Sequence, residues 1–156
     1  MKKIIKPIPT EYKGILFRSR LEARWAVFFD ELYLEWEYEV NGFDLDGTWY
    51  LPDFWLPQVK MWAEVKPIKF SDEESRKCKL LAEQSGFECL ELIGQPGDKP
   101  YWAHVPPSNG YSMRDYCLTN YHEYPKREGR FYCCPAEFDR FADTERAATV
   151  AKNMRF

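Results

Sequence analysis

The chain has 156 residues, of which 45% are apolar and 30% charged, so it can form one domain with a substantial core and is not wholly disordered. Its net charge of −3 argues against a protein that binds nucleic acid through an overall basic surface. No segment has the roughly 20 apolar residues of a membrane span, and the N-terminus lacks the apolar stretch of a signal peptide. The five cysteines show no framework spacing, which is typical of reduced thiols in a cytoplasm.

The first half of the chain predicts a helix followed by three strands. Residues 1–17 are expected to be extended, because Pro7 and Pro9 oppose a helix. Ser19 is a good N-cap for a helix over residues 20–33, where apolar residues recur at helical spacing. Strict alternation predicts a strand over residues 35–40, and two further strands are expected over residues 49–56 and 59–65. The turn signals between them are Asn41-Gly42, Asp46-Gly47 and Pro57-Gln58.

The next segment predicts a second helix and a fourth strand. Ser71 and Glu74 form a capping box that opens a helix over residues 72–85, and Gly86 ends it. Residues 87–93 then read as a strand. Short connections favour an antiparallel meander for the first three strands, whereas a helical crossover returns the fourth strand parallel. The prediction is an α/β (α+β) fold with an αβββαβ core and a mixed sheet.

The remainder of the chain is less regular. Residues 94–135 are rich in Pro, Gly, Tyr and Trp, and residues 137–153 have a loose apolar stripe that predicts a final helix. We therefore predict two parts, a core over residues 1–93 and a C-terminal extension over residues 94–156 that packs on it.

Three charged residues fall where two neighbouring strands would bring them together. Asp53 follows Pro52 on the second strand, and Glu64 and Lys66 lie two apart on the third, so they share a face. Asp53 can then lie across from Glu64, and two carboxylates with waters and a phosphate make a typical Mg²⁺ site. Lys66 would orient the attacking water or offset charge on the phosphate. Glu22, on the first helix, could complete the cation's ligands.

The order of elements and these residues together resemble the PD-(D/E)XK phosphodiesterase superfamily, in particular the branch that includes the end-cleaving nuclease of Tn7-type transposons. Ten residues separate Pro52-Asp53 from Glu64-Val65-Lys66. The resemblance covers about residues 14–93 and is carried by three segments, FRSRLE at 17–22, YLPDF at 50–54 and WAEVKP at 62–67.

The resemblance implies a restriction-endonuclease-like fold and a role for each matching residue. Asp53, Glu64 and Glu22 would hold Mg²⁺ or Mn²⁺, with Lys66 as the catalytic lysine. It also implies DNA as the substrate, a phage or other mobile element as the source, a homodimer, and a protein partner for targeting. The chain departs from such nucleases in its overall acidity and in having no recognisable DNA-reading module.

Simpler interpretations exist for each of these residues. Glu22 could instead complete a capping box with Ser19, and the two roles are compatible. Glu64 and Lys66 could form a charge pair on a solvated strand face. The basic residues of the first helix could line a solvated face or contact phosphates; they are Arg18, Arg20 and Arg24. The tryptophans at alternating positions are expected in the core rather than stacked on bases; they are Trp49, Trp55 and Trp62.

Other combinations carry less chemistry. Adjacent Cys133 and Cys134 lack the spacing of zinc ligands, even with Cys117 and His122 upstream. His104 and His122 have no positioned nucleophile, so a hydrolase triad is unsupported. The sequence therefore favours a cytoplasmic, metal-dependent DNA nuclease. The alternatives are a catalytically silent protein of the same fold that binds nucleic acid or a host defence or nuclease complex, and a phosphodiesterase acting on RNA or nucleotides.

Overall fold

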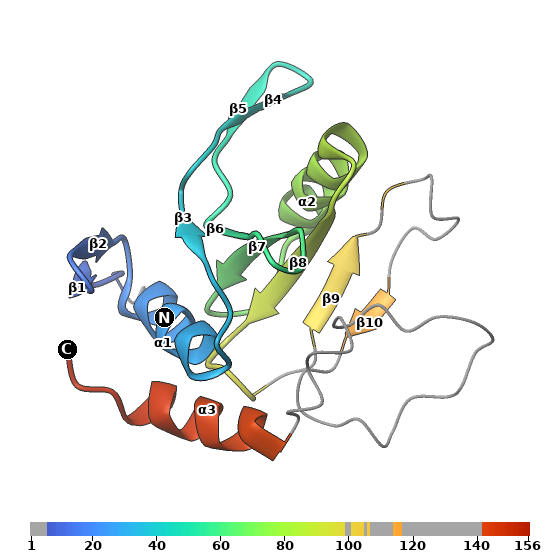
Figure 1. Ribbon diagram of the computed structural model, residues 1–156. Coiled ribbons are helices and arrows are strands. Elements are labelled where there is room, and N and C mark those ends of the chain that lie inside the picture. Colours follow the sequence, from blue (N-terminus) through green and yellow to red (C-terminus); the bar gives the residue numbers. More distant parts are fainter. Residues whose placement is uncertain (1–5, 99–100, 105, 107–113, 117–141) are drawn as a thin grey trace.

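The computed structural model describes residues 6–98, 101–104, 106, 114–116 and 142–156, and these form a mixed α and β architecture (Figure 1). The helices are α1 (Arg20–Glu31), α2 (Asp72–Ser85) and α3 (Ala142–Asn153). The strands are β1 (Thr10–Tyr12), β2 (Ile15–Phe17), β3 (Glu37–Tyr38), β4 (Phe43–Leu45), β5 (Thr48–Tyr50), β6 (Phe54–Leu56), β7 (Met61–Lys66), β8 (Glu88–Ile93), β9 (Tyr101–His104) and β10 (Arg114–Tyr116). None of the described helices is long and apolar enough to cross a membrane.

A mixed sheet forms the centre of the molecule, with the strand order β10-β9-β8-β7-β6-β3. Strands β6 and β7 are antiparallel, whereas β7 and β8 are parallel in a register that runs from Met61 opposite Glu88 to Lys66 opposite Ile93. The prediction that the α2 crossover returns a parallel strand is confirmed. Its capping box of Ser71 and Glu74 is present, and Gly86 ends the helix with a left-handed φ of 76°.

Helices cover both faces of this sheet. Buried residues of α1 and α3 pack on one face against apolar residues of β6, β7 and β8. The other face packs Trp62 and Cys89 against Cys78 and Leu81 of α2. Successive side chains of a strand point to opposite faces, so each central strand contributes to both apolar layers. The central strands are therefore buried between the helices on the two faces.

The single strand predicted over residues 49–56 is wrong. It divides into β5, which pairs with β4 in a separate hairpin, and β6, which belongs to the central sheet. Asp46 and Gly47 close the hairpin with φ of 53° and 83°, as a two-residue turn between right-twisted strands requires. Pro52 donates no amide hydrogen bond, which favours a break in the strand at this point. The β4–β5 hairpin projects beyond the central sheet (Figure 1).

This hairpin also overturns the prediction that Trp49 lies in the core. The Trp49 side chain is 71% exposed, because β5 lies outside the central sheet. Its indole lies over Gly42, where an added Cβ would come within 2.1 Å of the ring. The prediction holds for Trp62, which is buried, and Trp55 packs against it with ring centroids 4.5 Å apart.

Several predicted boundaries also differ from the structure. Only Glu37 and Tyr38 of residues 35–40 form a strand, because Glu39 takes a positive φ of 49° and the partner strand is short. The third strand begins at Met61, after Lys60 with a φ of 54°. Residues 101–104 form β9, which extends the sheet beside β8. This strand was not predicted, because the sequence shows no alternation there.

We expect Phe54→Ala to lower the free energy of unfolding by about 3–5 kcal/mol. Phe54 is fully buried and contacts the rings of Phe17, Phe29, Trp36 and Tyr38. Urea unfolding followed by circular dichroism measures the loss. The control Ile68→Ala removes a side chain that is 74% exposed and should cost less than about 0.5 kcal/mol. Equal costs for the two variants would contradict this description of the core.

Candidate active site

Asp53 lies immediately before β6 and is held in place by its neighbours. Its carbonyl oxygen accepts a hydrogen bond from the Glu39 amide at 2.9 Å. Its carboxylate Oδ2 accepts from the backbone amide of Val65 on β7 at 2.8 Å. The residue is only 2% exposed. The break between β5 and β6 therefore lets the Asp53 carboxylate point toward β7. There it accepts the Val65 amide, which in a continuous strand pair would bond to a backbone carbonyl.

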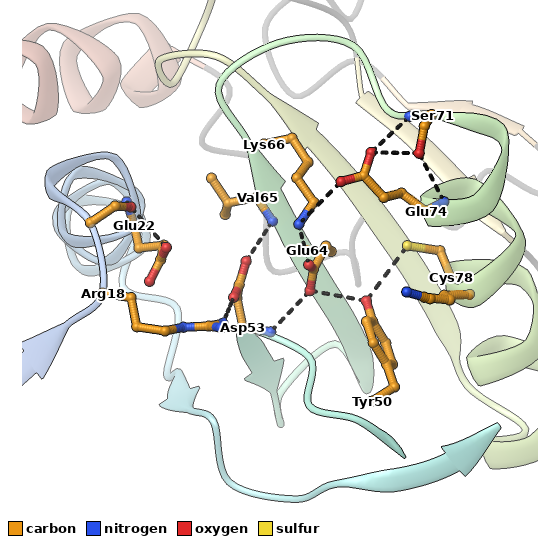
Figure 2. Close-up of polar contacts among 12 residues, drawn as sticks. Arg18, Glu22, Tyr50, Asp53, Glu64, Val65, Lys66, Ser71, Glu74 and Cys78 are labelled. Carbon is orange, nitrogen blue, oxygen red and sulfur yellow. Dashed lines mark hydrogen bonds and ion pairs between the residues drawn. The ribbon is translucent and has the colours of Figure 1, made fainter. Parts of the chain in front are cut away.

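Glu64 is on β7, beside Asp53, and a hydrogen bond joins the two residues. The Asp53 amide donates to Glu64 Oε2 at 3.3 Å, and the Tyr50 hydroxyl donates to the same oxygen at 2.9 Å. Glu64 is buried at 6% exposure. Burial raises the pKa of Tyr50 far above its ordinary value, so its hydroxyl keeps the proton that it donates. Asp53 and Glu64 thus form one buried carboxylate pair, as the sequence predicted (Figure 2).

Lys66 brings a positive charge to the same place. Its Nζ lies 2.9 Å from Glu64 Oε1 and 3.6 Å from Glu74 Oε1 at the start of α2. Burial opposes the charged form of Lys66, but the carboxylates of Glu64, Asp53 and Glu74 outweigh it, so the pKa of Lys66 is raised. Lys66 is therefore protonated, and the predicted shared face of Glu64 and Lys66 is present.

Glu22 faces the site from the first turn of α1. Its amide donates to Ser19 Oγ at 3.1 Å, which caps the helix. Its carboxylate accepts from the Ser19 hydroxyl at 2.8 Å and from the Tyr38 hydroxyl. The alternative role in a capping box is therefore only half realised, because the structure gives no bond from the Ser19 amide to this carboxylate. Its charge acts on Asp53, whose pKa it helps to raise.

Arg18 supplies the second positive charge. Its Nη2 donates to Asp53 Oδ1 at 2.7 Å, and its Nε lies 2.6 Å from Glu39 Oε1. Figure 2 shows Arg18 reaching Asp53, while Lys66 and Tyr50 reach Glu64. Arg20 is exposed at the start of α1, and Arg24 is half-buried with its Nε lacking a partner among the described residues. Only Arg18 of these three arginines has an ion pair with the carboxylates.

Burial and acidic neighbours both disfavour the charged form of Asp53. Burial raises the pKa of the Asp53 carboxyl well above its ordinary value, and the charges of Glu64 and Glu22 raise it further. The Val65 amide and Arg18 act in the opposite direction without cancelling this rise. Glu64 and Glu22 thus act on Asp53 with like charge, and a nearby cation would oppose this effect.

The carboxylate pair fits a hard divalent cation in its chemistry. Asp53 and Glu64 offer oxygen ligands, and Mg²⁺ commonly takes one or two carboxylates and completes its shell with waters and phosphate oxygens. Among the described residues, no group of three or more His, Cys, Asp or Glu side chains is arranged to hold a metal ion. Glu22 therefore contributes charge in this arrangement, and its role as a direct ligand remains a prediction.

Four residues of the site were missed at the sequence level. Tyr50 and Tyr38 donate hydrogen bonds to Glu64 and Glu22, and Glu39 and Glu74 contact Arg18 and Lys66. No sequence spacing indicates these tyrosines or Glu39. Tyr50 reaches the site from the β4–β5 hairpin, Tyr38 from the two-residue strand β3, and Glu39 from the residue after it. Glu74 was visible only as a helix-capping residue, and the structure gives it both roles.

The remaining chemical candidates are a buried histidine and free thiols, of which Cys78 Sγ lies 3.8 Å from the Tyr50 hydroxyl (Figure 2). His104 Nε2 lies 2.7 Å from Glu91 Oε1, and both residues are buried between β8 and β9. Cys78 and Cys89 are buried free thiols. The candidates for a zinc site fall outside the described residues; they are Cys117, His122, Cys133 and Cys134.

No family model, curated protein or solved structure matches this chain. The family resemblance therefore remains an inference from the residues and the geometry of the site.

We expect Asp53→Asn to gain stability relative to the unchanged protein as the pH rises. A carboxyl whose pKa is raised by folding stabilises the protein below its unfolded pKa, and this contribution is lost as the pH rises through the folded pKa. Urea unfolding at pH 5 and pH 8 without divalent cations measures the difference between the two proteins. The control Glu35→Gln changes an exposed carboxylate. A stability difference for Asp53→Asn that stays constant or shrinks toward pH 8 would contradict the raised pKa.

Proposed function

We propose that this protein is a Mg²⁺- or Mn²⁺-dependent phosphodiesterase of the PD-(D/E)XK superfamily that hydrolyses DNA. The observation that carries the proposal is the buried pair of Asp53 and Glu64, joined by the hydrogen bond from the Asp53 amide to Glu64 Oε2 at 3.3 Å. Lys66 is on the same strand as Glu64, and its Nζ lies 2.9 Å from Glu64 Oε1. The restriction-endonuclease-like description of the core is part of the same proposal. It is supported by the order α1, β3, β6, β7, α2, β8, in which the β4–β5 hairpin is inserted between β3 and β6.

Each residue has a role that follows from its position. Asp53 and Glu64 would hold the cation through their carboxylates, and Glu22 would complete the ligands directly or through water. A bound divalent cation lowers the pKa of water and stabilises charge on a phosphoryl oxygen. Lys66, held between Glu64 and Glu74, would orient the attacking water or neutralise the phosphate. Tyr50 fixes the Glu64 carboxylate through its hydrogen bond.

DNA is proposed as the substrate from the family resemblance, and the basic residues before and on α1 supply phosphate contacts. Residues 1–30 hold seven Lys and Arg against three acidic residues, although the whole chain has a net charge of −3. The chemistry of the carboxylate pair does not select deoxyribose over ribose, so RNA belongs in the same assay.

We expect the protein to cleave supercoiled plasmid or single-stranded DNA in Mg²⁺ or Mn²⁺, and EDTA to stop the reaction. Glu64→Gln, Asp53→Asn and Lys66→Ala should each lower the cleavage rate by at least about 100-fold, because the first two weaken the proposed cation site and the third removes the positive charge proposed to act on the water or the phosphate. Gel electrophoresis of product over time measures the rate, and a parallel assay uses single-stranded RNA.

The matched control is Glu73→Gln, which removes a carboxylate from α2 that is 78% exposed. This variant should cleave at the unchanged rate. Cleavage that survives in Asp53→Asn and Glu64→Gln would exclude the proposed site, and cleavage of RNA alone would change the substrate while leaving the site in place.

A second candidate is a binding protein of the same fold without turnover. The observation that favours it is the internal neutralisation of the site, in which Arg18 pairs with Asp53 and Lys66 with Glu64. A folded protein that is inert in both metals would support this candidate, and capture of a nucleic acid or protein partner without divalent cation would then identify its ligand.

A further inference from the structure

We propose that the Arg18 guanidinium occupies the place beside Asp53 where a divalent cation would bind. A bound divalent cation would then displace the guanidinium from Asp53. This inference rests on the proposed function, since it concerns how the same carboxylate pair is regulated. It goes beyond a phosphate contact for Arg18, because it makes metal binding and the position of this side chain mutually dependent.

The Arg18 guanidinium lies between two carboxylates. Its Nη2 donates a hydrogen bond to Asp53 Oδ1 at 2.7 Å, and its Nε forms an ion pair with Glu39 Oε1 at 2.6 Å. An arginine is always charged in proteins, and the charge-assisted bond to Asp53 is therefore strong. The other Asp53 oxygen already accepts the Val65 amide. Arg18 therefore neutralises the oxygen of Asp53 that the backbone leaves free.

Lys66 does not pair with Asp53 in place of Arg18. Lys66 Nζ lies 2.9 Å from Glu64 and 3.6 Å from Glu74, so its ion pairs are with the other carboxylate and with α2. The two positive side chains thus divide the pair, one for each carboxylate. A cation placed between Asp53 and Glu64 would meet the positive charge of Arg18 on the Asp53 side.

Arg18 combines a fixed backbone with an exposed side chain. Phe17 is fully buried, Ser19 caps α1, and the Arg18 amide donates to the Tyr38 hydroxyl at 3.1 Å, so the backbone is fixed on both sides. The Arg18 side chain is nevertheless 58% exposed, whereas that of Asp53 is 3% exposed. Released from Asp53, the guanidinium would remain beside the site, where its planar donors suit two oxygens of a phosphate.

Mutual exclusion at Asp53 has a measurable consequence. If Arg18 and the cation compete for one carboxylate, each weakens the other by the same factor. Removing the guanidinium should then tighten cation binding. Removing the equal charge of Arg20 on α1 should have little effect, because that exposed charge has no ion pair with the carboxylates and is screened by salt.

The experiment titrates the metal-free full chain with Mn²⁺ alone, without DNA, at about 0.15 M salt, and measures free Mn²⁺ by electron paramagnetic resonance. Arg18→Gln should bind Mn²⁺ at least about fivefold more tightly than the unchanged protein. The control Arg20→Gln removes the same charge from an exposed position two residues away and should leave the affinity unchanged. Arg18→Lys, which keeps the charge but loses the planar fork, should fall between the two.

The possible outcomes separate this inference from the proposed function. Equal or weaker Mn²⁺ binding by Arg18→Gln, in a protein that binds Mn²⁺ and cleaves DNA, would overturn the inference alone. Equal tightening in Arg18→Gln and Arg20→Gln would also overturn it, because the effect would then be general charge removal. No Mn²⁺ binding by any variant would overturn both. If Arg18→Gln does not fold by circular dichroism, Arg18→Lys decides, and unchanged affinity in that variant contradicts the inference.

Discussion

The burial of two carboxylates side by side, Asp53 before β6 and Glu64 on β7, is the constraint on which the rest of the site depends. Ionised carboxylates are costly to bury unless they are paired and hydrogen-bonded. The structure meets this condition from four directions. The Val65 amide and Arg18 bind Asp53, and Tyr50 and Lys66 bind Glu64. Even so, the pKa of Asp53 is raised by burial and by its acidic neighbours.

This constraint explains why segments distant in the sequence meet at one point. The β4–β5 hairpin ends in Tyr50, which fixes Glu64, and residues 17–22 bring Arg18 and Glu22 to the side of Asp53 (Figure 2). The start of α2 adds Glu74 beside Lys66. Burial and acidic neighbours disfavour the ionised form of Asp53, and perturbed carboxyl groups of this kind are frequent at functional sites. This property supports the proposal of a bound cation.

The sequence predicted the central elements because their signals are local. Ser19, Ser71 and Gly86 mark helix ends, and the crossover rule gives the parallel pairing of β7 with β8. The alternation of Glu64 and Lys66 predicted their shared face. The division of residues 49–56, the exposure of Trp49 and strand β9 were not predictable in this way, because each depends on which distant strand offers a partner. The ion pair of Arg18 with Asp53 and the hydrogen bond of Tyr50 with Glu64 were not predicted for the same reason, since contacts between residues 35 and 14 positions apart leave no local pattern.

The central claim is that Asp53 and Glu64 together bind a divalent cation. The most direct measurement is the thermal midpoint of unfolding as Mg²⁺ is added to the unchanged protein and to Asp53→Asn. A cation that binds only the folded state raises the midpoint with concentration. The account predicts a rise for the unchanged protein that Asp53→Asn loses. The same response in both proteins, or no response in either, would contradict it.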